Sequence, residues 1–189
     1  MKPKIVLASG NKNKLREFRE ILTEYDIMSC KELGFTEEIE EDGKTFYENA
    51  LIKAKAVATA LNVPAISDDS GICVDALDGA PGIYSARYAG DGIDEHNNEL
   101  LLKNMQGVTN RKAKFVSAIV CYSPDGTIKY AEGETEGEIM FAPEGEHGFG
   151  YDPIFFSKDL QKSLGVATPE EKNKISHRYR ALMKIKELL

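Results

Sequence analysis

The chain has 189 residues, of which 42% are hydrophobic, so it is long enough to bury a substantial core without disulfides. Its 31 acidic residues outnumber its 24 basic ones and give a net charge of -7, which argues against a protein that binds nucleic acid by neutralising its backbone. Small phosphorylated ligands remain compatible with this charge, because local cations, a helix N-terminus or a divalent metal hold phosphates whatever the net charge.

The first third of the chain predicts a strand, a polar loop and two helices. The run KIVLAS is typical of a buried strand, and LREFREILTEY repeats its apolar residues at helical spacing. A second helix is predicted over TFYENALIKAKAVATALN, where the apolar residues form one stripe. Thr45 is its expected N-cap, with Glu48 three residues later.

The remaining elements alternate between strands and helices. PAISDDSGICVDAL predicts two short strands around an acidic turn, and residues 94–106 predict a helix. Two long strands follow, joined at a Pro-Asp-Gly turn that favours a hairpin. A Gly-rich loop, a strand near YDPIFF and a helix from about Ser176 complete an α/β domain with a mixed sheet, expected to be one domain over residues 1–189.

The cysteines and the apolar runs indicate the class of protein. Cys30, Cys73 and Cys121 are odd in number and lack Cys-x-x-Cys spacing, so we expect reduced, buried thiols rather than disulfides or a zinc site. No apolar run approaches the length of a membrane span. We therefore expect a cytoplasmic protein with neither a membrane nor a nucleic-acid partner.

The hexapeptide SGNKNK, residues 9–14, lies between the first strand and the first helix. Backbone amides at such a junction point toward any anion placed there, Gly10 permits close approach, and Lys14 adds a cation. The spacing is not that of a Walker A loop. An ordinary turn with Asn11 or Asn13 as the helix cap is an equally good interpretation of these residues alone.

Two acidic clusters and one lysine suggest a metal and phosphate site. One cluster is EED at residues 40–42, and the other is Asp68, Asp69 and Asp75 after a predicted strand; Mg²⁺ favours a few carboxylate oxygens completed by water and substrate phosphate. Each cluster alone is more typical of an ordinary turn, a solvated turn for EEDG and a turn at a strand end for DDSG. Lys53 lies at the margin of the helical stripe, where it either extends its ammonium to water or points into a phosphate site.

Two later segments suggest a site for a flat ligand. In GEHGFGYDPIFF the glycines allow a loop to fold closely around a ligand, and Phe149 and Tyr151 offer rings for stacking on a base, unless they are core residues. In ISHR, His177 and Arg178 lie in the first turn of a predicted helix, where the dipole disfavours cations. A ligand acceptor would relieve that placement, and an exposed basic pair is the alternative.

Six motifs combine these signals between residues 4 and 180. They are SGNKNK, EEDGKTFYENALIKA, SDDSG, DALDGAPGIYSARYAG, FGYDPIF and ISHR. Together, in this order and spacing, they resemble the inosine/xanthosine triphosphate pyrophosphatase family, whose members remove deaminated purine nucleotides. The resemblance implies an elongated mixed sheet with flanking helices, two lobes around a substrate cleft, a homodimer and a Mg²⁺ cofactor.

The resemblance also implies roles for individual residues. It assigns metal binding to Glu40 and Asp69, with Asp69 also the proton acceptor. Contacts with the triphosphate are implied for Ser9, Gly10, Asn11, Lys12, Asn13, Lys14 and Lys53, and a contact with the substrate is implied for Ser70. Contacts with the base are implied for Phe149, Gly150, Tyr151, Asp152, Lys172, His177 and Arg178.

These roles predict hydrolysis of ITP, dITP and XTP to the monophosphate and pyrophosphate. Mg²⁺ and the lysines would neutralise the triphosphate while water, activated near Asp69, attacks the α-phosphorus. A metal ligand is a weakened base, so Asp68 or a metal-bound hydroxide is an alternative to Asp69. Donors from His177, Arg178 or Lys172 would match the 6-oxo group of the purine. Guanine shares that group and has to be rejected at its 2-amino group.

Two other functions fit parts of the sequence. A Maf-type nucleotide pyrophosphatase shares a similar opening loop, but ISHR and FGYD speak against it. A nucleotide-binding module without catalysis, such as a sensor, has little use for extra carboxylates beside a polyanion. Magnesium-dependent turnover separates an enzyme from such a module.

Overall fold

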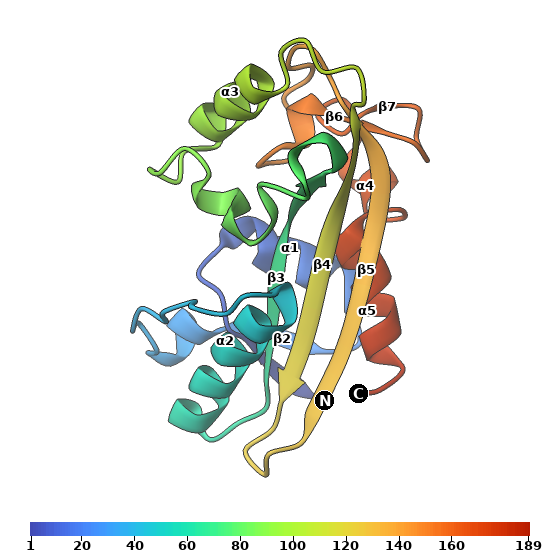
Figure 1. Cartoon of the computed structure of the whole chain (residues 1–189). Coiled ribbons are helices and arrows are strands. Elements are labelled where there is room, and N and C mark those ends of the chain that lie inside the picture. The colour runs from blue at the N-terminus through green and yellow to red at the C-terminus, as the bar shows by residue number, and fades with distance from the viewer. The chain divides into compact units, whose positions relative to one another are not determined.

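A computed structural model describes residues 1–189, and the chain divides into two compact units (Figure 1). Unit 1 comprises Met1–Asp69, Ser117–Gly133 and Tyr179–Leu189, and unit 2 comprises Ser70–Val116 and Glu134–Arg178. Three strands, β3, β4 and β5, contribute residues to both units. The chain passes from the first unit to the second inside β3, between Asp69 and Ser70.

The sheet has seven strands in the order β2-β1-β3-β4-β5-β6-β7. Strand β1 pairs in parallel with β2 and β3, whereas β6 pairs antiparallel with β5 and β7. The predicted α/β fold with a mixed sheet is therefore confirmed. The strands are β1 (Lys4–Leu7), β2 (Asp26–Ser29), β3 (Ala65–Val74), β4 (Lys112–Tyr122), β5 (Ile128–Ile139), β6 (Phe155–Ser157) and β7 (Lys162–Ser163).

Five α-helices flank the sheet, and four short 3-10 helices lie in the segments that connect the strands and α-helices. The α-helices are α1 (Lys12–Ile21), α2 (Phe46–Leu61), α3 (Asp94–Asn104), α4 (Pro169–Lys172) and α5 (His177–Lys186). The 3-10 helices are η1 (Cys30–Leu33), η2 (Asp75–Leu77), η3 (Gly82–Arg87) and η4 (Asp152–Ile154). No helix is both long enough and apolar enough to cross a membrane.

Unit 1 buries apolar residues on both faces of its strands. In β1, Ile5 and Leu7 belong to a core cluster that also contains Phe18 of α1 and residues of α5. Val6, which alternates with them, belongs to a second cluster with Val57 of α2. Because successive strand side chains point to opposite faces, α1 and α5 cover one face and α2 covers the other.

Unit 2 has a separate core. Its buried cluster combines β3 and β4 with α3 and the segment after β5, and includes Ile72, Leu101, Phe115 and Phe155. The rings of Phe115 and Phe155 lie 4.5 Å apart between centroids. Strand β6, which begins at Phe155, is therefore attached to β4 by a buried aromatic contact.

Most predicted elements are confirmed, and one is wrong. Thr45 caps α2 as expected, since its side chain accepts a hydrogen bond from the backbone of Glu48. PAISDDSGICVDAL does not form two strands around a turn, because β3 runs without interruption from Ala65 to Val74. Asp68 and Asp69 lie inside this strand, and both are buried.

Three smaller findings complete the comparison with the predicted elements. Strand β2 and helix α4 were not predicted, although Thr168 and Glu171 form a capping box that marks the start of α4. The three cysteines were expected to be reduced, buried thiols. Cys30 and Cys121 are buried, which raises the pKa of both thiols, whereas Cys73 is only partly buried.

Candidate active site

The loop that precedes α1 has the geometry of a capped helix start. The side chain of Asn11 accepts hydrogen bonds from the backbone N of Asn13, at 2.9 Å, and of Lys14, at 3.2 Å. The backbone N of Asn11 donates to Oγ of Ser9 at 3.1 Å. Asn11 is thus the N-cap, which was one of the two capping residues considered, and the first turn of α1 carries no acidic residue. An anion at this end of the helix would meet no opposing carboxylate from that turn.

Lys14 and Lys53 converge on the same peptide group of β3. Nζ of Lys14 lies 2.9 Å from Oδ2 of Asp68 and 3.4 Å from its main-chain oxygen. Nζ of Lys53 lies 2.9 Å from that same main-chain oxygen, 2.9 Å from Oε1 of Glu41 and 3.4 Å from Oδ1 of Asp69. The structure therefore brings both predicted lysines together with one carboxylate from the loop and two from β3.

Lys53 does not extend its ammonium to water. Its side chain is only 12% exposed. Burial would lower the pKa of Lys53, but the carboxylates of Asp69 and Glu41 outweigh that effect and hold the pKa above its usual value. Lys53 is therefore a charged group inside the cluster.

The two aspartates of β3 differ in how their oxygens are used. Asp68 accepts a short hydrogen bond from the hydroxyl of Ser117 on Oδ1 and pairs with Lys14 through Oδ2. Asp69 pairs with Lys53 through Oδ1, but its Oδ2 is buried without a hydrogen-bond partner. Burial raises the pKa of Asp69 to about 6, although Lys53 and Lys14 oppose the shift. Asp69 is therefore the carboxylate with capacity left for a proton, a water or a cation.

The two metal ligands predicted from the sequence, Glu40 and Asp69, differ in burial. No group of three or more His, Cys, Asp or Glu side chains is arranged to hold a metal ion. Glu40 is exposed, and Glu41 is the carboxylate that reaches Lys53. The vacant Oδ2 of Asp69 suits Mg²⁺, which commonly takes one or two protein carboxylates and completes its shell with water and substrate phosphate.

A third lysine lies at the same loop and was missed in the sequence. A side chain at position 10 would place its Cβ 2.6 Å from Cε and 2.7 Å from Nζ of Lys31, so Lys31 crosses Gly10. Lys31 follows β2, which pairs in parallel with β1. The carboxyl ends of parallel neighbours meet at one edge of a sheet, and that rule was the available signal.

The predicted base-binding loop is held by an ion pair in unit 2. Oδ2 of Asp152 accepts from Nζ of Lys172 at 2.7 Å and from the backbone N of Phe149 at 3.0 Å. Both charged side chains are buried. Nζ of Lys172 lies 4.5 Å and Cζ of Arg178 5.8 Å from the centroid of the Phe149 ring. Three of the predicted base contacts therefore gather around Phe149.

Gly148 and Gly150 let this loop close on itself. Both have positive φ, 74° at Gly148 and 60° at Gly150. A Cβ at position 148 would lie 2.1 Å from Oδ2 of Asp152, so only glycine fits beside that carboxylate.

Tyr151 and the basic pair of ISHR are core residues of this region. The hydroxyl of Tyr151 donates to the carbonyl of Ser85 at 2.6 Å, and burial raises the pKa of Tyr151. Tyr151 therefore offers no open face for stacking, unlike the half-buried Phe149. Arg178 is 1% exposed and donates to Oγ of Ser70 at 3.1 Å. His177 is buried with its ring stacked on another aromatic ring, so the interpretation as an exposed basic pair is wrong.

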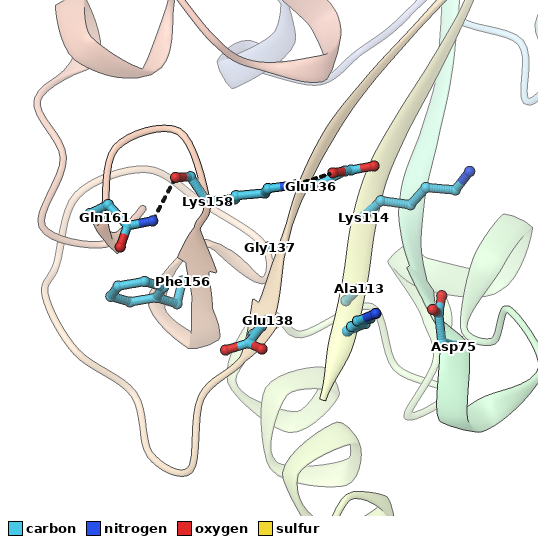
Figure 2. A pocket seen from close by; sticks show the side chains of 10 residues that line it. Asp75, Ala113, Lys114, Glu136, Gly137, Glu138, Phe156, Lys158 and Gln161 are labelled. Atoms are coloured by element: carbon cyan, nitrogen blue, oxygen red, sulfur yellow. Dashed lines mark hydrogen bonds and ion pairs between the residues drawn. The ribbon is translucent and has the colours of Figure 1, made fainter. Parts of the chain in front are cut away.

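A separate surface hollow of unit 2 contains only Asp75 of the acidic residues considered for a metal site, and none of the substrate-binding residues. It has a volume of about 690 Å³ and lies over β4, β5 and β6 (Figure 2). Two of its lysines are paired across the strands: Lys158 lies 3.0 Å from Glu136 of the hollow (Figure 2), and Lys114 lies 2.7 Å from Glu134, which is outside the lining. Paired charges of this kind are typical of a solvated sheet face.

Nearly the whole length of the chain is similar to proteins of a single family. Residues 5–188 match the model of a family described as the Ham1 family. A protein of Bacillus subtilis named dITP/XTP pyrophosphatase is 50% identical over 189 residues, covering 97% of this chain and 96% of its own.

Solved structures agree with the sequence comparison. The Ham1 protein of Staphylococcus aureus has a TM-score of 0.89 and 44% identity, over 98% of this chain and 97% of its own. A Mycobacterium abscessus structure, described as a nucleoside-triphosphatase / dITP/XTP pyrophosphatase, has a TM-score of 0.79 and 40% identity, over 96% of this chain and 98% of its own.

Proposed function

The chain belongs to the Ham1 family, and we propose that it hydrolyses the deaminated purine nucleoside triphosphates ITP, dITP and XTP to the monophosphate and pyrophosphate. The names of its relatives support this activity. The observation in the molecule that carries the proposal is the carboxylate of Asp69, which is buried beside two lysines and leaves one oxygen vacant.

In the proposed reaction, the lysines of unit 1 bind the triphosphate. Lys14 and Lys53 form ion pairs with nearby carboxylates, and phosphate oxygens would replace part of those contacts. Positive charge near the phosphates stabilises the negative charge that develops on pyrophosphate as it leaves. The N-terminal end of α1 adds the partial positive charge of the helix dipole to that of the lysines.

Asp69 is the proposed proton acceptor for the attacking water. A carboxylate with a pKa of about 6 is mostly ionised at neutral pH and is a stronger base than an ordinary aspartate. Asp68 is less suited, because Ser117 and Lys14 already occupy both of its oxygens. Its role in the proposal is to hold Lys14 in place.

Mg²⁺ is part of the proposal, with Asp69 and Glu40 as the protein ligands. The vacant oxygen of Asp69 supports this choice, and the exposed Glu40 would have to approach it. When bound, the ion would supply positive charge for the triphosphate beyond that of the lysines. Ligation would lower the pKa of Asp69 and so weaken it as a base, which opposes the effect of its burial.

Recognition of the base is assigned to unit 2. Phe149 offers its ring for stacking, and Lys172, His177 and Arg178 are donors for the 6-oxo group of hypoxanthine or xanthine. The 6-amino group of adenine would leave buried donors unpaired, at a cost of roughly 1–3 kcal/mol for each.

The activity is tested by incubating the protein and its Asp69→Asn variant with Mg²⁺ and, separately, ITP, XTP, GTP or ATP. We expect monophosphate and pyrophosphate from ITP and XTP alone, and a loss of roughly 10²- to 10⁴-fold in kcat for the variant. Release of single phosphates would contradict the proposed reaction. Tight binding without turnover would favour a nucleotide sensor instead.

Two further parts of the proposal concern the whole protein. As the resemblance of its motifs suggests, we propose a cytoplasmic homodimer. Light scattering on the eluted peak of a gel-filtration column measures the mass, and a value equal to that of one chain would contradict the dimer.

A further inference from the structure

The first turns of α3 hold the loop that carries Phe149. Oδ2 of Asp94 accepts a hydrogen bond from the backbone N of Gly150 at 2.9 Å. Nδ2 of Asn98 donates to the backbone O of Gly150 at 3.1 Å. Asp94 and Asn98 are four residues apart, so they share one face of the helix. Together they fix the peptide groups on both sides of a single glycine.

This glycine is the residue of the loop that most needs fixing. Gly150 has a positive φ of 60°, and glycine moves between backbone conformations more freely than any other residue. The other side of the loop is already fixed, because Asp152 accepts from the backbone N of Phe149 and its own N donates to the O of Phe149 at 3.2 Å. Without the bonds from α3, rotation at Gly150 would be the remaining way to reorient the loop.

The ring of Phe149 depends on that backbone for its position. Phe149 is only partly buried and belongs to none of the four apolar clusters, and its ring faces the cations of Lys172 and Arg178. Ordinary core packing therefore does little to hold the ring.

Asn98 makes its bond to Gly150 under unfavourable conditions. The residue is 8% exposed, and its Oδ1 is buried without a hydrogen-bond partner. A buried acceptor left unpaired lowers stability, so an apolar residue would suit a purely structural position at least as well. The hydrogen bond to Gly150 is therefore the contact that accounts for an amide side chain at this position.

We propose that Asp94 and Asn98 are positioning residues that set the affinity for the purine by fixing Gly150, and through it the ring of Phe149. The inference rests on the proposed function and extends it to two residues outside the six motifs. Neither residue would affect binding of the triphosphate, because both act on the base-binding loop alone.

The neighbouring Asn97 offers a matched control. It is 2% exposed, lies on the same turn of α3 and makes two comparable hydrogen bonds, from Nδ2 to the O of Ala86 at 3.1 Å and to Oδ1 from the N of Ala89 at 2.8 Å. Its bonds hold the last turn of η3 and Ala89 beyond it, and do not reach Gly150. Asn97→Ala therefore reports what the loss of two buried hydrogen bonds does to the helix.

The test measures KM and kcat for dITP, the inhibition constant of inorganic triphosphate, and thermal unfolding. We expect Asp94→Ala and Asn98→Ala each to raise KM roughly 2- to 10-fold with kcat nearly unchanged, which is the effect of one lost hydrogen bond. The inhibition constant should not change. Asp94→Asn should behave like the wild type, because its amide oxygen still accepts from Gly150. Asn97→Ala should lower the unfolding temperature and leave KM unchanged.

Two results would overturn the inference while the proposed function stands. One is that the wild type is active and that Asp94→Ala and Asn98→Ala have the same KM for dITP as the wild type. The other is a parallel rise in KM and in the inhibition constant, which would indicate general disruption. A folded wild type that does not turn over dITP would instead overturn the proposed function, and the inference with it.

Discussion

The carboxylates of the two regions are used in opposite ways. In unit 1, Asp69 is buried with one oxygen vacant, and Lys53 divides its ammonium among three oxygens at 2.9 to 3.4 Å. In unit 2, Asp152 forms a buried pair with Lys172 at 2.7 Å and also binds the backbone of Phe149. The first arrangement leaves charge to be completed by a ligand, and the second is complete without one.

This difference suggests a division of labour. A region with an unsatisfied carboxylate is less stable in the empty protein, and a charged ligand would relieve that cost. A loop whose carboxylate is already paired, as Asp152 is with Lys172, is organised before the ligand arrives, so less conformational freedom is lost on binding. In the proposed function, unit 1 performs the chemistry on the phosphates and unit 2 selects the base.

The largest expected effect is a loss of stability when the buried pair of Asp152 and Lys172 in unit 2 is broken. Asp152→Ala would leave the ammonium of Lys172 buried without its carboxylate, and the loss of one member of a buried pair typically costs about 3–5 kcal/mol. We expect the free energy of unfolding in urea to fall by this amount.

The double variant Asp152→Ala/Lys172→Met serves as the control, because it removes the unpaired charge together with its partner. It should recover part of the lost stability. Equal unfolding free energies for Asp152→Ala and the wild type would show that the pair is not the support of this loop.

The opposite change is expected in the incomplete region, where Asp69→Asn should stabilise the protein. The folded pKa of Asp69, about 6, is above the ordinary value of 3.8, so the folded state holds this proton more tightly than the unfolded state. Stability is therefore lost as the pH rises from about 4 through 6. The variant avoids this cost, which corresponds to about 2–3 kcal/mol at pH 7.5 and disappears near pH 4.

Thermal unfolding of both proteins in a chelating buffer, between pH 4 and pH 8, measures this difference. A variant less stable than the wild type at pH 7.5 would mean that the pair with Lys53 outweighs the burial of Asp69. Adding Mg²⁺ sharpens the experiment, since it should stabilise the wild type and not the variant.

The smallest expected effect concerns Lys31, which crosses Gly10 but is exposed. One exposed cation contributes up to about 1 kcal/mol to an ionic contact, so Lys31→Met should raise KM by no more than roughly fivefold. The effect should disappear at high salt. Lys55→Met, an exposed lysine on α2, is the control, and equal KM values for the two variants would exclude a role for Lys31.

The sequence predicts those parts of the fold that depend on neighbouring residues. Helix α2 is one such part, because the apolar stripe and the cap Thr45 act locally. Strand β3 was misjudged because Asp-Asp-Ser-Gly is typical of a turn. The partners that hold Asp68 inside the strand, Lys14 and Ser117, lie 54 and 49 residues away in the chain.

The candidate site shows the same limit. Its motifs identify Lys14, Lys53 and Asp69, which the structure brings together. Motifs do not show that Glu41 reaches Lys53 or that Asp94 fixes Gly150, because these contacts join elements that are distant in the sequence. Only the folded chain decides which of several adjacent carboxylates faces a lysine.

The most direct test of the proposed reaction is hydrolysis of dITP in water enriched in ¹⁸O, with both products examined by mass spectrometry. Attack of water on the α-phosphorus predicts that the label appears in the nucleoside monophosphate and that the pyrophosphate is unlabelled. Label in the pyrophosphate would show attack on the β-phosphorus and contradict the proposed roles of Asp69 and the two lysines.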